Sequence, residues 1–137
     1  MQRPDTISIV KDLIDAVNNH EMDAVLRLFD DNAILSAEPP LPRSPKRIYS
    51  GRGEIGQWLG ALMAEHVSIV GSNFKASGNE VNWDARISSD RFAELGIDPL
   101  ESRVRTVLEG SLIRSIGLNF SPDSVKKIES VTAAQPG

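Results

Sequence analysis

The sequence of 137 residues contains no cysteine. This absence excludes disulfide bonds, a thiol nucleophile and every metal site built from thiolates. Aromatic residues are scarce, at 5 % of the chain. No apolar run approaches the roughly 18 residues of a membrane-spanning helix, and no apolar segment of a secretion signal precedes Lys11 and Asp12. We therefore expect a cytoplasmic protein with no membrane partner.

The charge balance is mildly acidic, because 15 Lys and Arg residues against 19 Asp and Glu residues give a formal net charge of −4. A basic surface is the electrostatic signature of nucleic-acid-binding proteins, so we expect no nucleic-acid partner. Apolar residues make up 40 % of the chain, which is typical of a globular domain. Length and composition predict one domain over 1–137, with an ordered core at 6–130 and a tail at 131–137.

Hydrophobic periodicity predicts helices first and strands afterwards. Apolar residues recur at helical spacing in three segments, at 6–18, at 21–30 and after Gly51 and Gly53. Alternation predicts strands at 33–37, 67–76, 81–88, 103–108 and 112–120, with an irregular stretch at 90–99. Pro122 begins a short closing helix at 122–130. This order predicts an α+β protein in which three N-terminal helices pack on one face of a curved antiparallel sheet.

A segment with four prolines, 38–47, is neither a helix nor a central strand. It overlaps a basic stretch that holds Arg43, Lys46, Arg47 and Arg52. The basic residues are interpreted either as a lip that attracts an acidic ligand or as a solvated loop.

Three short motifs occur in a recognisable order. They are Leu28-Phe29-Asp30-Asp31-Asn32-Ala33, then Tyr49-Ser50-Gly51-Arg52-Gly53-Glu54-Ile55, then Glu109-Gly110-Ser111-Leu112-Ile113 followed by Phe120-Ser121-Pro122. With the order of elements, they resemble the nuclear-transport-factor-2-like (SnoaL-like) superfamily over about 6–130. That superfamily includes ketosteroid isomerases, limonene epoxide hydrolases and polyketide cyclases. The resemblance implies a cone-shaped fold with a pocket between helices and sheet, and it leaves the reaction open.

The period of two along a strand predicts which side chains face that pocket. In 81–88, burying Trp83 and its alternate apolar neighbours is favourable, so Asp84 and Arg86 are expected to point outward. In the last strand the same alternation predicts that Arg114 lies on one face together with Ile116 and Leu118. The expected substrate-binding residues are Leu35, Trp58, Leu62, Trp83, Ile116 and Leu118.

The candidates for catalysis are few. The resemblance implies that the polar catalytic positions of the hydrolases fall here on the apolar residues Leu35, Ala37, Ala85, Ile87 and Leu118. Glu38 is the one candidate for a general base. The alternative interpretation is a solvated carboxylate at the start of the proline segment. We interpret His66 either as a proton shuttle or as a histidine at a helix end whose hydrogen bonds are satisfied. Tyr49 either donates its hydroxyl group into the pocket or packs its ring.

No phosphate-binding loop, metal-spaced cluster or Ser-His-Asp pattern is present, and the two histidines, His20 and His66, are far apart in the sequence. We therefore expect no metal and no cofactor.

Two functions stay open. One is a cofactor-independent isomerase, cyclase, hydrolase or lyase acting by acid–base chemistry on a hydrophobic cyclic substrate. The other is a non-catalytic binding or interaction module. The expected partners are a small hydrophobic molecule and a second copy of the chain. We expect the second copy to bind through the sheet face that carries Asp84 and Arg86. The alternatives for these two residues are a surface ion pair and a role in orienting a polar substrate.

Overall fold

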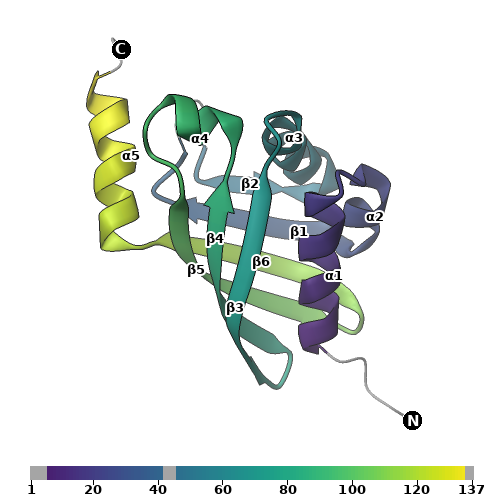
Figure 1. Ribbon diagram of the computed structural model, residues 1–137. Helices are drawn as coiled ribbons and strands as arrows, with labels where there is room; N and C mark the ends of the chain where they lie inside the picture. The colour runs from purple at the N-terminus through teal and green to yellow at the C-terminus, as the bar shows by residue number, and fades with distance from the viewer. Residues whose placement is uncertain (1–5, 42–45, 135–137) are drawn as a thin grey trace.

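Six strands form one sheet in the computed structural model, which describes residues 6–41 and 46–134 (Figure 1). The strands are β1 (Phe29–Glu38), β2 (Ile48–Ser50), β3 (Ser68–Ser77), β4 (Glu80–Ser88), β5 (Leu100–Glu109) and β6 (Leu112–Phe120). The helices are α1 (Thr6–Asn18), α2 (Met22–Arg27), α3 (Gly51–Ala64), α4 (Asp90–Glu94) and α5 (Pro122–Ala134). The strand order is β2-β1-β6-β5-β4-β3. No helix in this described part of the chain is both long and apolar enough to cross a bilayer.

The sheet is strongly curved and covered on its inner face by two helices. Figure 1 shows β3 and β4 running steeply across the view, whereas β1 and β6 lie crosswise behind them. Helix α1 packs against β3, and α3 packs against β1. Helix α5 stands apart from both, at the other side of the sheet (Figure 1). The predicted α+β class with helices on one face of a curved sheet is confirmed. The sheet is mixed rather than wholly antiparallel, because β1 and β6 pair in parallel.

The alternation predicted for β4 is confirmed. Val81, Trp83, Ala85 and Ile87 are at most 5 % exposed, while Asp84 and Arg86 lie on the opposite face. Burial of one apolar face drives this arrangement, because a shift of one residue would bring the charged set into the core.

The face predicted for β6 is wrong at Arg114. Val107 of β5 pairs with Ser115 and Leu108 with Ile113, so Arg114 is an extra, bulged residue of β6; Ile113 is buried and Arg114 is exposed. One extra residue in a strand pair reverses the facing of everything beyond it. Beyond the bulge, Ile116 and Leu118 face the core as expected.

Several boundaries differ from the prediction. Strand β1 begins at Phe29, because α2 already ends at Arg27. The stretch expected to be irregular contains α4, which begins after Ser89, and the Ser89 side chain accepts a hydrogen bond from the Phe92 backbone N–H. Helix α5 extends past its predicted end at 130 to Ala134, into the expected tail. Residues 42–45, including Arg43, and 135–137 lie outside the described residues.

Candidate functional site

An apolar cavity of about 50 Å³ lies between the inner face of the sheet and the helices α1 and α3. Fifteen residues line it, and every one of them is apolar. Helix α1 contributes Leu13, Ile14 and Val17, helix α3 contributes Trp58, Leu59 and Leu62, and the sheet contributes Phe29, Leu35, Ile69, Trp83, Ala85, Ile87, Val104, Ile116 and Leu118. No titratable side chain is among these lining residues. The cavity therefore presents a hydrocarbon surface to whatever enters it.

All six residues expected to bind substrate lie along this cavity: Leu35, Trp58, Leu62, Trp83, Ile116 and Leu118. Strand alternation brings the sheet residues there, and helical spacing brings Trp58 and Leu62 to the same side of α3. Their contact with a ligand stays a prediction.

Trp83 is the largest side chain contributed by the sheet, and its polar atom is satisfied. The indole Nε1–H donates to Oγ1 of Thr106 at 3.1 Å, and Thr106 is fully buried. The ring also stacks on Phe74, with ring centroids 5.7 Å apart. A buried donor without a partner would be costly, so this bond allows a tryptophan to form the cavity wall.

The cavity wall depends on a glycine at position 71 of β3. A Cβ atom there would lie 2.6 Å from Cζ of Phe74 and 2.8 Å from Cδ1 of Ile14. Those distances are well inside van der Waals contact. The missing side chain lets α1 approach the sheet closely at this point.

Of the described residues that line the cavity, none is a predicted catalytic residue. Glu38 is the last residue of β1, its side chain is 52 % exposed, and it lies 3.7 Å from Arg47. Tyr49 is buried and packs against Trp58, with 5.7 Å between the ring centroids. Catalytic roles for Glu38, Tyr49 and His66 stay predictions, but the geometry gives none of them a place inside the cavity.

His66 leaves the apolar face of α3 on which it was expected. It follows the helix in a left-handed conformation, with φ of 57°, and its side chain is 71 % exposed. Its Nδ1 lies 2.5 Å from Oδ2 of Asp90, and its ring centroid lies 6.0 Å from that of His20. Asp90 was missed in the sequence, because its partner is 24 residues away and no local pattern joins the two.

The basic stretch after the proline segment does not form an open lip in its described part. Lys46 pairs with Glu54 and Arg47 with Glu38. Arg52 donates two hydrogen bonds to the carbonyl oxygen of Phe29 and pairs with Asp31. The backbone N–H of Ser50 and the ammonium group of Lys46 lower the pKa of Glu54 below its usual value.

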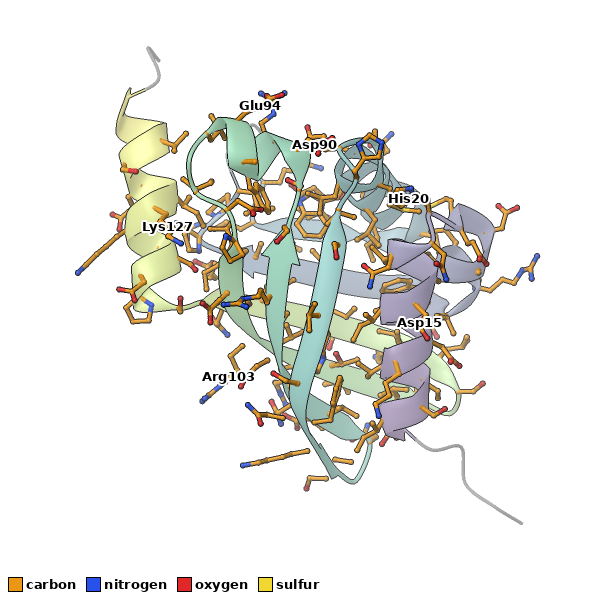
Figure 2. All side chains as sticks on the ribbon, in the orientation of Figure 1. Asp15, His20, Asp90, Glu94, Arg103 and Lys127 are labelled. Carbon is orange, nitrogen blue, oxygen red and sulfur yellow. The ribbon has the colours of Figure 1, made fainter. Side chains whose placement is uncertain are left out.

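The outer face of the sheet carries polar grooves of about 370 and 530 Å³. Both contain Asn73, Asp84 and Arg103. Asn73 donates to Asp84 at 2.8 Å, and Arg103 lies 3.8 Å from the same carboxylate. Figure 2 shows Arg103 on the side of the molecule away from α1. Asp84 therefore interacts with Arg103 of the neighbouring strand and lies outside the apolar cavity.

Within residues 6–41 and 46–134, no group of three or more His, Asp or Glu side chains is arranged to hold a metal ion. The two histidines, which are far apart in the sequence, are ring neighbours in the structure.

No protein-family model matches the sequence, and no curated protein matches it significantly. Solved structures do match. Bal32a from a soil-derived mobile gene cassette is 16 % identical with a TM-score of 0.75, covering 89 % of this chain and 93 % of that one. SalBIII, an epoxide hydrolase/cyclase-like enzyme in pyran ring formation in the polyether salinomycin, is 17 % identical with a TM-score of 0.72, covering 87 % and 92 %.

An NTF2-like protein of unknown function from Cytophaga hutchinsonii is 17 % identical with a TM-score of 0.68, covering 92 % of this chain and 97 % of that one. These matches span almost the whole length of both chains, so they concern the complete arrangement of helices and sheet. The chain therefore has the nuclear-transport-factor-2-like fold.

Proposed function

We propose that the protein binds a compact hydrophobic molecule in the cavity between α1, α3 and the inner face of the sheet. The observation that carries this proposal is the lining of fifteen apolar side chains. A polar molecule would lose its hydrogen bonds to water there without replacement. An apolar molecule would instead be removed from water, which is favourable in proportion to the area buried.

The cavity volume limits the ligand. About 50 Å³ is more than the roughly 10–15 Å³ that one water needs, and less than the roughly 150 Å³ of an engineered cavity that binds benzene. Leu62 and Ile69 are the two lining residues that are only partly buried. A ring fits only if lining side chains move, and we propose that these two, the least buried of the fifteen, move outward to admit it.

Binding is favoured over catalysis because of where the acids and bases lie. General acid–base catalysis needs a titratable group within hydrogen-bond reach of the reacting atom. The described lining residues supply none. The enzymatic alternative draws on the likeness to SalBIII, which is described as epoxide hydrolase/cyclase-like. In that alternative, Glu38, Tyr49 or His66 would have to reach a ligand that extends out of the cavity.

The test uses the two tryptophans of the chain, Trp58 and Trp83, both of which line the cavity. Their fluorescence is titrated with methylcyclohexane. We expect a saturable change in emission, and we expect Ala85→Leu to weaken binding at least about tenfold because it places three extra carbon atoms in the cavity.

The matched control is Ala61→Leu, which adds the same atoms on the exposed side of α3. It should leave binding unchanged. Absence of saturable binding to the wild type, or equal binding by the Ala85→Leu variant, would refute the proposed function. Glu38→Gln should also bind normally, since Glu38 does not line the cavity.

A further inference from the structure

One wall of the cavity is formed where the end of α1 meets the start of β3. Ile69 of β3 lines the cavity and is one of its two partly buried lining residues. Strand β3 pairs with β4 and is the outermost strand of the sheet on that side. Helix α1 packs beside β3 (Figure 1), and Val17 in its last turn lines the cavity as well. We call this place, formed by Val17, Asn18 and Ile69, the α1–β3 seam.

The backbone of Ile69 is bound by the side chain of Asn18. The amide nitrogen Nδ2 of Asn18 donates to the carbonyl oxygen of Ile69 at 2.8 Å, and the backbone N–H of Ile69 donates to Oδ1 of Asn18 at 2.7 Å. Opposite residues of an antiparallel ladder alternate between hydrogen-bonded and non-hydrogen-bonded pairs. Ile69 lies opposite Ile87 of β4, and its polar backbone groups point to Asn18, so this pair is a non-hydrogen-bonded one. Asn18 therefore takes the place of a neighbouring strand at this residue.

The side chain of Ile69 cannot leave the cavity wall independently of its backbone. Isoleucine is branched at Cβ, which restricts rotation about χ1. A large outward displacement of the side chain therefore requires a displacement of the backbone at the edge of the sheet. That displacement breaks both hydrogen bonds to Asn18.

The rest of α1 stays attached when these two bonds break. One turn earlier in the helix, Ile14 packs closely over Gly71 of β3, where a Cβ atom would lie 2.8 Å from Cδ1 of Ile14. The bonds of Asn18 are only part-buried, so water can replace them when they open. Openings of this local kind occur in proteins without global unfolding.

We propose that Asn18 is a latch on the cavity, and that a ligand enters and leaves through the α1–β3 seam when the two bonds from Asn18 to Ile69 break. This inference rests on the proposed function and adds the route of entry and its control. The latch is closed both in the free protein and around a bound ligand. It therefore sets the rates of binding and release, and it leaves the affinity almost unchanged.

The test measures these rates by stopped-flow tryptophan fluorescence with methylcyclohexane as the ligand. Asn18→Ala removes the latch and leaves every lining side chain in place. We expect the association and dissociation rate constants both to rise about tenfold, which corresponds to the net contribution of two hydrogen bonds. The dissociation constant should change by less than about twofold, because both rates rise together.

The matched control is Ser124→Ala. Oγ of Ser124 accepts a hydrogen bond from the backbone N–H of Glu101, so this variant also removes a side-chain bond to a strand backbone, between α5 and β5. Ser124 does not line the cavity. Both rate constants should therefore stay at their wild-type values, which separates the latch from a general loss of stability.

Amide hydrogen exchange of the ligand-free wild type tests the opening itself. We expect the Ile69 amide to exchange through a local opening that low concentrations of urea do not accelerate. The amide of Val104, in a strand paired on both sides, should exchange only with global unfolding. Equal protection of the two amides would overturn the inference.

The kinetic results can overturn the inference in three further ways. Asn18→Ala can leave both rate constants unchanged, which would mean that the ligand enters elsewhere. It can raise the dissociation rate constant alone, which would mean that Asn18 stabilises the bound state. Ser124→Ala can accelerate binding as much as Asn18→Ala does. Failure of methylcyclohexane to bind the wild type would instead refute the proposed function, and this inference with it.

Discussion

Asn18 at the end of α1 pairs with the backbone of Ile69 in β3 through two hydrogen bonds. Its Nδ2 donates to the carbonyl oxygen of Ile69 at 2.8 Å, and the backbone N–H of Ile69 donates to its Oδ1 at 2.7 Å. Strand β3 is at the edge of the sheet, so the amide satisfies backbone groups that would otherwise lack a neighbouring strand. The same pair attaches α1 to a strand that lines the cavity.

Asn18→Ala should therefore destabilise the fold. The variant leaves a part-buried N–H and C=O without their partner, which costs about 1–3 kcal/mol in the free energy of unfolding. Urea unfolding measures the change. The control is Asn19→Ala, at an exposed neighbouring position, which should change stability by less than about 0.5 kcal/mol. Equal effects of the two substitutions would contradict the role given to Asn18.

Gly71 provides a second test of the contact between α1 and the sheet. Gly71→Ala should lower the free energy of unfolding by about 1–3 kcal/mol, because the new methyl group overlaps Phe74 and Ile14. Phe74 cannot move without disturbing its stack on Trp83. Gly53→Ala is the matched control, since its Cβ would meet no atom within 4 Å on a helix. That control should stabilise the protein by about 0.5–1 kcal/mol through helix propensity, and destabilisation by both variants would contradict the steric explanation.

The cavity wall could be predicted from the sequence, but the contact between His66 and Asp90 could not. Along β4, burial of Trp83 and exposure of Asp84 follow from alternation alone, because only one register keeps the charges in water. The facing of Arg114 depends on a bulge at that residue, which interrupts the alternation along β6 and which strict alternation cannot predict. The meeting of His66 with Asp90 depends on how two turns fold in space, and α4 was too short to give a helical pattern.

The ion pair between Glu80 and Arg105 should make the free energy of unfolding depend on pH. Hydrogen bonds from Arg105, with Asn82 adding to them, hold the pKa of Glu80 below its ordinary value. A carboxyl group whose pKa is lower in the folded state contributes stability above its unfolded pKa and loses that contribution as the pH falls. Glu80→Gln should therefore lower the urea midpoint at neutral pH, and the difference from the wild type should shrink between about pH 5 and pH 3.

The comparison for this pH effect is made in the Arg105→Gln background. Without Arg105 the main cause of the lowered pKa is gone, so Glu80→Gln should have a smaller and flatter effect there. A difference that stays constant from pH 7 to pH 3 in the wild-type background would show that the pair does not contribute through its charge.

Association of two copies through the outer face of the sheet, expected from the sequence, has a specific place to be tested. Ile34 of β1 and Ile48 of β2 are 45 % and 57 % exposed, and they lie diagonally on that face beside Ser36 and Gly117. An exposed apolar patch with small neighbours is suited to self-association about a two-fold axis. We predict twice the chain mass by light scattering at micromolar concentration, and a single chain mass for the double variant Ile34→Lys, Ile48→Lys. A monomeric wild type would contradict this prediction. A double variant that is still a dimer would contradict it as well.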